Sequence, residues 1–281
     1  MRKRRRRFAA LCDRLKKKAV RNVNSCLQID LGLIAYAEAW ELQKRVVAAR
    51  KAGAIDDVLL FCEHPHVITL GRSGNRSNLL ANENVLRQKG VEYFETTRGG
   101  DITYHGPGQI VGYPILNLGA IRRDVVWYVR QLEQAMIRAT AELGIEARRE
   151  PGKTGIWVDG TGVSPEPSKS ESPPSLGTSQ KPAEKLAAIG VHISRWVTSH
   201  GLAYNVATDL RYFELIVPCG IAQRKATSLE KLLGRNIATA DIKPILAKYL
   251  GEVFDLTVRT AERADLFEKL QEFEQALPVP A

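Results

Sequence analysis

The chain has 281 residues and a formal net charge of +10, and its 44% hydrophobic and 26% charged residues are typical of a globular protein. Residues 1–21 hold 11 of the Lys and Arg side chains and one acid, Asp13, so this leader carries the whole net charge. The rest of the chain is neutral, which argues against a nucleic-acid-binding core. Phe8 is the leader's single aromatic residue, too few for base stacking.

Residues 1–25 form a run of like charges with little apolar periodicity, which predicts a disordered or loosely helical tail. An organelle transit peptide and a wrongly assigned start codon are the alternatives. Neither a secretory signal nor a membrane span is visible. The four cysteines lack CxxC spacing and a nearby His pair, which argues against zinc and disulfides and favours the reducing cytoplasm. They are Cys12, Cys26, Cys62 and Cys219, of which the first two lie in or near the tail.

The rest of the chain predicts helices and strands without a regular βαβ order. Apolar residues recur at helical spacing before Gly53, a good helix stop, and in residues 124–143, where Gly144 follows. Asp56 and Asp57 lie at a strand edge and are expected in a turn. The expected strands are 58–62, 67–70, several within 91–118, 156–158, 186–193 and 201–206; the expected helices are 124–143, 228–233, 242–254, 264–277 and one that follows a short strand within 28–53.

Residues 161–183 contain six Ser, five Pro and two Gly with few apolar side chains, so they predict a surface insertion that does not order itself. We therefore expect a leader, residues 1–25, and a single domain, residues 26–281, that carries this insertion. The mixed order of elements predicts an α+β domain with a mixed or largely antiparallel sheet. The absence of a GxGxxG after a strand, of a Walker A sequence and of a GxSxG motif argues against dinucleotide, P-loop and serine hydrolase sites.

Residues 98–109 combine four glycines with polar side chains. Glycine permits a positive φ and close approach of the backbone to a ligand. Arg98, Tyr104, His105 and Gln109 would supply polar groups around such a site. A tight hairpin with satisfied polar groups accounts for the same spacing, so the pattern alone leaves both interpretations open.

Cys219 and Lys185 are the candidate reactive side chains. Cys219 follows a Pro and precedes a Gly, where a bend would present the thiol, although a lone Cys is often an inert buried side chain. Lys185 leads into an apolar strand. It either extends its amine to solvent or, in an apolar pocket, acts as a base or as the ammonium partner of a thiolate. His192 and His200 are alternative bases.

Taken together, several segments resemble the octanoyl-acyl-carrier-protein:protein N-octanoyltransferases of lipoate biosynthesis, members of the biotin/lipoate protein ligase catalytic-domain superfamily. The matching segments, which follow the family's order, are residues 63–65, 69–72, 98–114, 152–158, 185–190, 200–205 and 218–221. Any one of them is a weak signal, but the set is specific and covers roughly residues 29 to 250.

The resemblance implies an α/β sandwich with a mixed, largely antiparallel sheet flanked by helices. It also implies ping-pong acyl transfer, in which Cys219 takes an octanoyl group as a thioester and Lys185 favours the thiolate and manages the proton. The product is an amide on the ε-amine of a lipoyl-domain lysine, the first step of endogenous protein lipoylation. The residues that match the family's acyl-substrate-binding segments are Arg98, Gly99, Gly100, Asp101, Ile102, Thr103, Tyr104, His105, Ala188, Ile189, Gly190, Gly201, Leu202 and Ala203.

The implied donor is octanoyl-acyl carrier protein, and the implied acceptors are lipoyl domains of 2-oxoacid dehydrogenase complexes and the glycine-cleavage H protein. The acyl group arrives on phosphopantetheine as a thioester, so neither ATP nor a metal is expected. These partners are acidic in the family context, and a neutral core would need a local basic patch to attract them. Candidates for this patch are Arg72, Arg76, Arg122, Arg123, Arg148 and Arg149.

The leader and the insertion depart from the family's pattern. The insertion precedes Lys185 and either shields the site or is merely tolerated. An ATP-dependent lipoate or biotin ligase on the same fold would need a nucleotide site and no catalytic Cys, and an octanoyl amidotransferase would differ only in its donor. The Pro-Cys-Gly segment together with Lys185 favours the transferase. A nucleic-acid-binding protein acting through residues 2–21 is the alternative from a different class.

Overall fold

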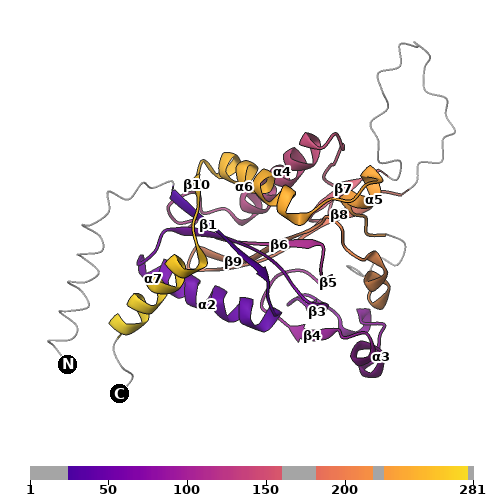
Figure 1. Ribbon diagram of the computed structural model, residues 1–281, viewed down its shortest axis with the longest axis horizontal. Helices are drawn as coiled ribbons and strands as arrows, with labels where there is room; N and C mark the ends of the chain where they lie inside the picture. Colours follow the sequence, from indigo (N-terminus) through magenta and orange to yellow (C-terminus); the bar gives the residue numbers. More distant parts are fainter. Residues whose placement is uncertain (1–24, 160–181, 218–224, 278–281) are drawn as a thin grey trace, which may run out of the picture.

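The computed structural model describes residues 25–159, 182–217 and 225–277, and these residues fold around two β-sheets (Figure 1). The larger sheet has the strand order β10-β1-β2-β6-β9-β8-β7, and the smaller has the order β4-β3-β5. The strands are β1 (Ser25–Leu33), β2 (Asp57–Glu63), β3 (Val67–Leu70), β4 (Glu92–Glu95), β5 (Ile102–His105), β6 (Gln109–Ile115), β7 (Ile156–Val158), β8 (Glu184–Ser194), β9 (Val197–Asn205) and β10 (Thr257–Thr260).

Both sheets mix strand directions. In the larger sheet β1 runs parallel to its neighbours β10 and β2, whereas the pairs β2–β6, β6–β9, β9–β8 and β8–β7 are antiparallel. In the smaller sheet β3 is parallel to β4 and antiparallel to β5. The predicted α+β class with a mixed, largely antiparallel sheet is therefore confirmed.

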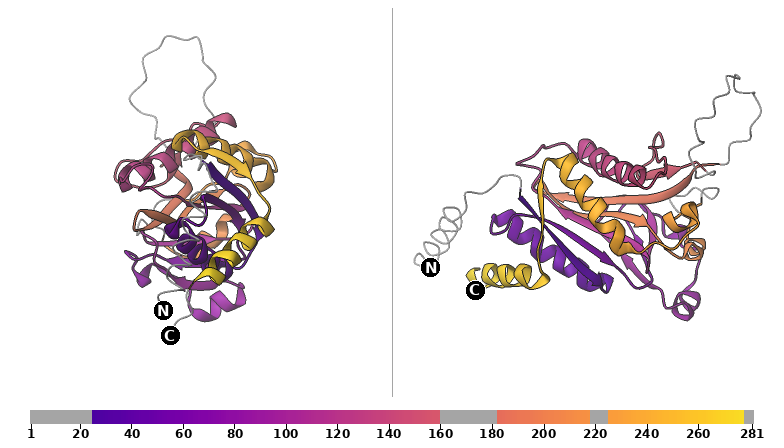
Figure 2. Two further views of the ribbon diagram at one scale, coloured as in Figure 1. Left: turned by 90° about the vertical axis from the view of Figure 1, so that its left-hand side faces the viewer. Right: turned by 45° about the horizontal axis from the view of Figure 1, so that its top comes forward.

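Helices cover both faces of the larger sheet, as Figures 1 and 2 show. The helices α2 (Tyr36–Ala52) and α7 (Arg263–Ala276) lie on one face, and α4 (Val125–Glu142) and α6 (Thr239–Phe254) lie on the other. Two buried apolar clusters fill the spaces between these layers. The remaining helical segments are α3 (Glu83–Gln88), α5 (Leu229–Leu233) and the 3₁₀ turns η1 (Arg76–Asn78) and η2 (Leu210–Leu215).

The ends of the main helices follow from local sequence. The α2 helix stops at Gly53, whose φ of 70° suits a residue without a side chain. Asp124 caps α4, because its carboxylate accepts a hydrogen bond from the Trp127 amide. Ser228 caps α5 in the same way through the Lys231 amide. The helices expected around residues 28–53, 124–143, 228–233, 242–254 and 264–277 are all present.

The strand predictions are confirmed with a few differences. The strands expected at 67–70 and 156–158 have the observed bounds, but α3, η2 and β10 were not predicted. The start of β9 was predicted at residue 201, but the strand begins at Val197. The difference arises because the residues of the preceding hairpin turn are not typical turn residues. Arg195 and Trp196 both have positive φ in this turn, a geometry usually taken by Asn and Gly.

Two residues correct the sequence interpretation. Asp57 was expected in a turn, but it begins β2, is 2% exposed and forms a 2.6 Å ion pair with Arg50. Cys26 was placed in or near the tail, but it lies in β1 and is 1% exposed. The expected leader and insertion lie almost wholly outside the described residues. No helix among the described residues is long and apolar enough to cross a membrane.

Helix α4 allows a direct test of the packing. Leu132 is completely buried against the sheet, so Leu132→Ala should lower the free energy of unfolding by about 2–5 kcal/mol. Val126 lies on the same helix and is 70% exposed, so Val126→Ala should change it by less than about 0.5 kcal/mol. Urea denaturation of both variants measures the difference, and equal losses would contradict the packing described here.

Candidate active site

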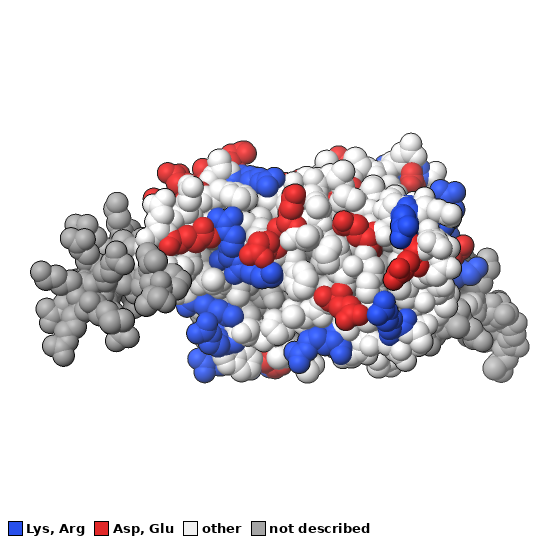
Figure 3. Space-filling model, turned by 90° about the horizontal axis from the view of Figure 1, so that it is seen from below, with Lys and Arg blue, Asp and Glu red and all other residues white. Residues whose placement is uncertain are grey.

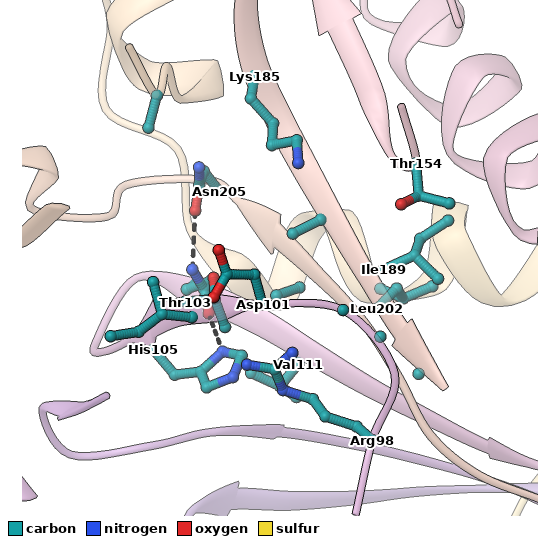
Figure 4. Close-up of a pocket in the computed structure, with 18 of the residues that line it drawn as sticks. Arg98, Asp101, Thr103, His105, Val111, Thr154, Lys185, Ile189, Leu202 and Asn205 are labelled. Carbon is teal, nitrogen blue, oxygen red and sulfur yellow. Dashed lines mark hydrogen bonds between the residues drawn. The ribbon is translucent and has the colours of Figure 1, made fainter. Parts of the chain in front are cut away.

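A cavity of about 250 Å³ lies where β6, β9 and β8 meet the segment that leads into β5. Every residue expected to bind the acyl substrate lines this cavity except Gly99 and Tyr104, and Lys185 lines it as well. Val111, Ile189 and Leu202 supply apolar walls, and Lys185 and Arg98 lie at opposite ends of the set drawn in Figure 4. The cavity is therefore an apolar slot with a cation near each end.

Lys185 lies in β8 and is held between the segment of residues 225–227 on one side and β7 on the other. Its backbone amide donates to the Lys225 carbonyl at 2.9 Å, and its carbonyl accepts from the Thr227 amide at 2.9 Å. On its other side it is paired with Trp157 of β7, at an irregularity in the β7–β8 register. Such bulges re-aim side chains near functional sites. The Lys185 Nζ lies 4.9 Å from the centre of the Trp157 ring, within the range of a cation–π contact.

A buried carboxylate holds the loop beside Lys185. Glu133 of α4 is completely buried and accepts hydrogen bonds from the Gly155 amide at 3.2 Å and the Arg149 guanidinium at 3.0 Å. Residues 152–154 of the same loop line the cavity. Lys153 in this loop lies 5.4 Å from the Trp157 ring, so two ammonium groups approach one indole.

A directional chain of hydrogen bonds crosses the floor of the cavity. The Gln109 amide oxygen is 2.7 Å from His105 Nδ1, which therefore donates, and the Gln109 Nε2 donates to Asn205 Oδ1 at 2.8 Å. Asn205 Nδ2 in turn donates to the Thr227 carbonyl at 2.9 Å. Figure 4 shows the links from His105 through Gln109 to Asn205. The chain connects β5, β6 and β9 to the segment that pairs with Lys185.

Arg98 is a buried cation at the other end of the cavity. It is 7% exposed, and its guanidinium donates to the Thr69 carbonyl at 2.6 Å and to the Thr69 hydroxyl at 2.9 Å. Further hydrogen bonds go from Nε to the Thr69 hydroxyl and from Nη1 to the Gly99 carbonyl. These bonds compensate for much of the lost hydration of the charge.

The buried histidines around Arg98 are neutral at physiological pH. Burial lowers the pKa of His64 to about 4, and burial with the repulsion of neighbouring charges lowers the pKa of His105 and of His200 to about 3. His105 and His200 both line the cavity. The slot thus presents uncharged imidazoles rather than imidazolium groups to a ligand. Within the part of the chain that the structure describes, no three His, Cys, Asp or Glu side chains are grouped as metal ligands.

The family model of the lipoyl protein ligase A/B catalytic domain matches residues 35–251. The chain belongs to this family. It is 47% identical to an octanoyltransferase of Solibacter usitatus over 83% of this chain and 94% of the relative. It is 45% identical to an octanoyltransferase of Acidobacterium capsulatum over 88% of this chain and 98% of the relative.

Solved structures of the superfamily confirm the fold. The chain matches a bi-partite lipoate protein ligase from Thermoplasma acidophilum with a TM-score of 0.63 and 12% identity, over 90% of this chain and 92% of that one. A lipoate-protein ligase A bound with ATP matches with a TM-score of 0.62 and 12% identity, over 90% and 94%. The lipoyl protein ligase fold implied by the sequence segments is therefore present.

Some residues of the predicted site lie elsewhere in this lipoyl protein ligase fold. Tyr104 is completely buried beside the cavity, and its hydroxyl is 2.7 Å from His66 Nδ1. Gly99 lines a neighbouring hollow. Cys219 lies outside the described residues. Sequence reasoning missed the cavity residues Tyr36, Phe213, Lys225 and Ala226, because none of them lies in a segment with a local signal of a site.

The six arginines considered as a docking patch differ in their partners. Arg122 pairs with Asp124, Arg148 with Glu150 and Asp159, and Arg149 with Glu133. The other three, Arg72, Arg76 and Arg123, form no ion pair among the residues that the structure describes. Figure 3 shows Lys and Arg side chains interspersed with Asp and Glu over the face that it presents.

The neutral histidines predict a pH-dependent stability. In the unfolded chain the pKa of an imidazole is about 6.5. In the folded chain the pKa of His64 is about 4, and that of His105 and of His200 is about 3. The unfolded state therefore takes up more protons between these values, so the free energy of unfolding should be highest above pH 6.5 and fall as the pH falls.

Urea denaturation between pH 7.5 and pH 5 measures this fall. His64→Gln should reduce the slope, because the amide can occupy the position between the Ile34 carbonyl and the Tyr113 hydroxyl without titrating. A free energy of unfolding that is independent of pH in this range would contradict the assignment of neutral buried imidazoles.

Proposed function

We propose that this chain is an octanoyltransferase of lipoate biosynthesis, which moves an octanoyl group from an acyl-carrier-protein thioester to the ε-amine of a lysine on a lipoyl domain. The observation that carries the proposal is the high identity to relatives named octanoyltransferase over nearly their whole length. The apolar cavity that ends at Lys185 supports it, because a slot of this kind accommodates an alkyl chain beside a proton-transferring group.

Cys219 is the nucleophile in this proposal. In the first half-reaction its thiolate attacks the carbonyl carbon of the donor thioester, a new C–S bond forms and the bond to the carrier sulfur breaks. The carrier thiolate takes the proton that Cys219 released. In the second half-reaction the neutral ε-amine of the acceptor lysine attacks the enzyme thioester, the C–N bond of the amide forms, the C–S bond to Cys219 breaks, and the amine's proton returns to the Cys219 sulfur. Thioester exchange is nearly isoenergetic and aminolysis of a thioester is downhill, so the reaction needs no ATP.

Lys185 manages the proton in both half-reactions. A nearby ammonium group favours the thiolate, and a positioned acid or base contributes about 10²–10⁴ in rate. The backbone bonds to residues 225 and 227 and the contact with Trp157 support this role, because they limit the positions that the Lys185 amine can reach. An amine held in position transfers a proton faster than a mobile amine does.

The cavity walls bind the acyl chain. Burial of each methylene contributes roughly 0.8 kcal/mol, and Val111, Ile189 and Leu202 offer the apolar surface for it. The neutral imidazoles of His105 and His200 carry no net charge that would oppose an alkyl chain. The acceptor lysine then approaches the thioester from the Lys185 end, where the loop of residues 152–154 lines the cavity.

Cys219→Ser should abolish the covalent octanoyl-enzyme, because a serine hydroxyl has no comparable anion near neutral pH. Intact-mass spectrometry after incubation with octanoyl-acyl carrier protein, without nucleotide, measures the adduct, and hydroxylamine should release it as expected of a thioester. Cys62→Ala is the matched control and should keep the adduct, because Cys62 is buried in β2. An adduct that persists in Cys219→Ser, or none in the unaltered protein, would contradict the proposal.

Lys185→Ala should raise the pH at which alkylation of Cys219 reaches half its maximal rate, because the thiolate loses its neighbouring cation. The rate of iodoacetamide labelling at Cys219, followed by peptide mass spectrometry from pH 5 to pH 10, measures the midpoint. Lys231→Ala is the control, since Lys231 is a nearby cation that pairs with Glu184 at 2.7 Å. Equal midpoints in the unaltered protein and Lys185→Ala would exclude the proposed role.

A further inference from the structure

A second hollow is lined by residues that adjoin those of the acyl cavity. It is an open hollow of about 410 Å³, lined by Arg72, Ser73, Thr97, Gly99, Val125, Val191, His192 and Ile193. Two of these residues are chain neighbours of cavity residues, since Gly99 adjoins Arg98 and Gly100, and Val191 adjoins Gly190. One layer of backbone and side chains therefore separates the two spaces.

His200 and Thr97 form the side-chain part of this wall. His200 lines the acyl cavity and Thr97 lines the second hollow, and His200 Nε2 lies 3.2 Å from Thr97 Oγ1. The backbone part is closed by a hydrogen bond of 2.8 Å from the Gly99 amide to the Val191 carbonyl. The wall is thus continuous from β8 and β9 to the segment before β5.

The backbone at His200 has an unusual conformation that is held from outside the sheet. Its φ is 55°, a left-handed value that a residue with a side chain seldom adopts. The His200 amide donates to Gln43 Oε1 at 2.8 Å, and Gln43 is a buried residue of α2. Residues held in such conformations concentrate at binding and catalytic sites. The result is a neutral, buried imidazole that lines the acyl cavity.

The length of the slot agrees with a chain of medium length. Strand β8 advances about 3.3 Å per residue, so Lys185 and Gly190 lie roughly 17 Å apart. With C–C bonds of about 1.5 Å, an extended octanoyl chain spans roughly 9 Å and a palmitoyl chain roughly 19 Å. The slot accommodates the first together with the Lys185 side chain, whereas the second would extend past the wall.

We propose that His200, supported by Thr97, is the specificity-determining residue that stops the acyl chain and limits the substrate to medium length. The inference rests on the proposed acyl transfer. A longer chain is rejected because it has to displace the buried His200 ring. If the ring is absent, the chain enters the second hollow, where Val125, Val191 and Ile193 offer apolar surface.

His200→Gly tests the wall, because glycine accepts the left-handed backbone and removes the ring. His200→Asn is an intermediate variant, since Asn also tolerates this backbone but fills only part of the space of the imidazole ring. The measurement is kcat/KM for carrier proteins loaded with hexanoyl, octanoyl, dodecanoyl and palmitoyl groups. The ratio of dodecanoyl to octanoyl kcat/KM should rise at least tenfold in His200→Gly and by a smaller factor in His200→Asn, in the order of the space that each side chain leaves. A purely structural loss lowers both substrates equally and leaves the ratio unchanged.

Gly190→Ala provides a second, opposite test. A Cβ at this position would lie 3.0 Å from Arg98 Cδ and 3.0 Å from the Gly99 carbonyl oxygen, so it narrows the closed end of the slot. The ratio of hexanoyl to octanoyl kcat/KM should therefore rise at least fivefold, in the direction opposite to His200→Gly. This variant decides the matter if circular dichroism shows that His200→Gly does not fold.

The outcomes separate this inference from the proposed function. If the unaltered protein transfers no acyl group, the proposed function fails. If it transfers octanoyl, and a folded His200→Gly or, failing that, Gly190→Ala keeps the chain-length ratios of the unaltered protein, the wall inference alone is overturned. Opposite shifts in the two variants establish the wall.

Discussion

Close backbone contact among β6, β9 and β8 is the constraint on which the site depends. A Cβ on Gly201 of β9 would overlap the Gly112 carbonyl of β6, and Gly201 also pairs with Gly190 of β8. Glycines at these crossings let backbone and Arg98 pack closely, since a Cβ on Gly190 would lie 3.0 Å from Arg98 Cδ. The same three strands carry Gln109, Asn205 and Lys185, so the register that permits the close contact also sets the positions of the polar groups.

The polar groups of the site are held by partners that lie behind them. Glu133 on α4 fixes the loop that lines the cavity beside Lys185, and Gln43 on α2 fixes the backbone of His200. These helices lie on opposite faces of the sheet (Figure 2). The two helix layers thus hold the two ends of the slot, one at the proposed reaction centre and the other at its closed end. Rigid elements position reacting groups better than loops do.

Most elements could be predicted because their signals are local. Gly53 ends α2 and Asp124 starts α4 through contacts within one turn of chain, and the short buried run Val67–Leu70 suffices for β3. The turn at Arg195 and Trp196 could not be predicted, because tertiary packing imposes positive φ on residues that do not favour it. β10 was missed for a similar reason, since Thr257–Thr260 is mostly exposed and is a strand only through its pairing with β1.

The sequence by itself determined the fold class, the order of the main elements and the family, because periodicity, caps and ordered segments are all properties of neighbouring residues. The segments that carry the family resemblance also contain most of the residues that line the cavity. Only the tertiary structure decided which of them meet. Gln109 and Asn205 are 96 residues apart, and Thr97 and His200 are 103 apart. Such contacts depend on strand register and helix packing, which no local pattern encodes. They bring the separate segments together into a single cavity between Lys185 and the proposed wall at His200.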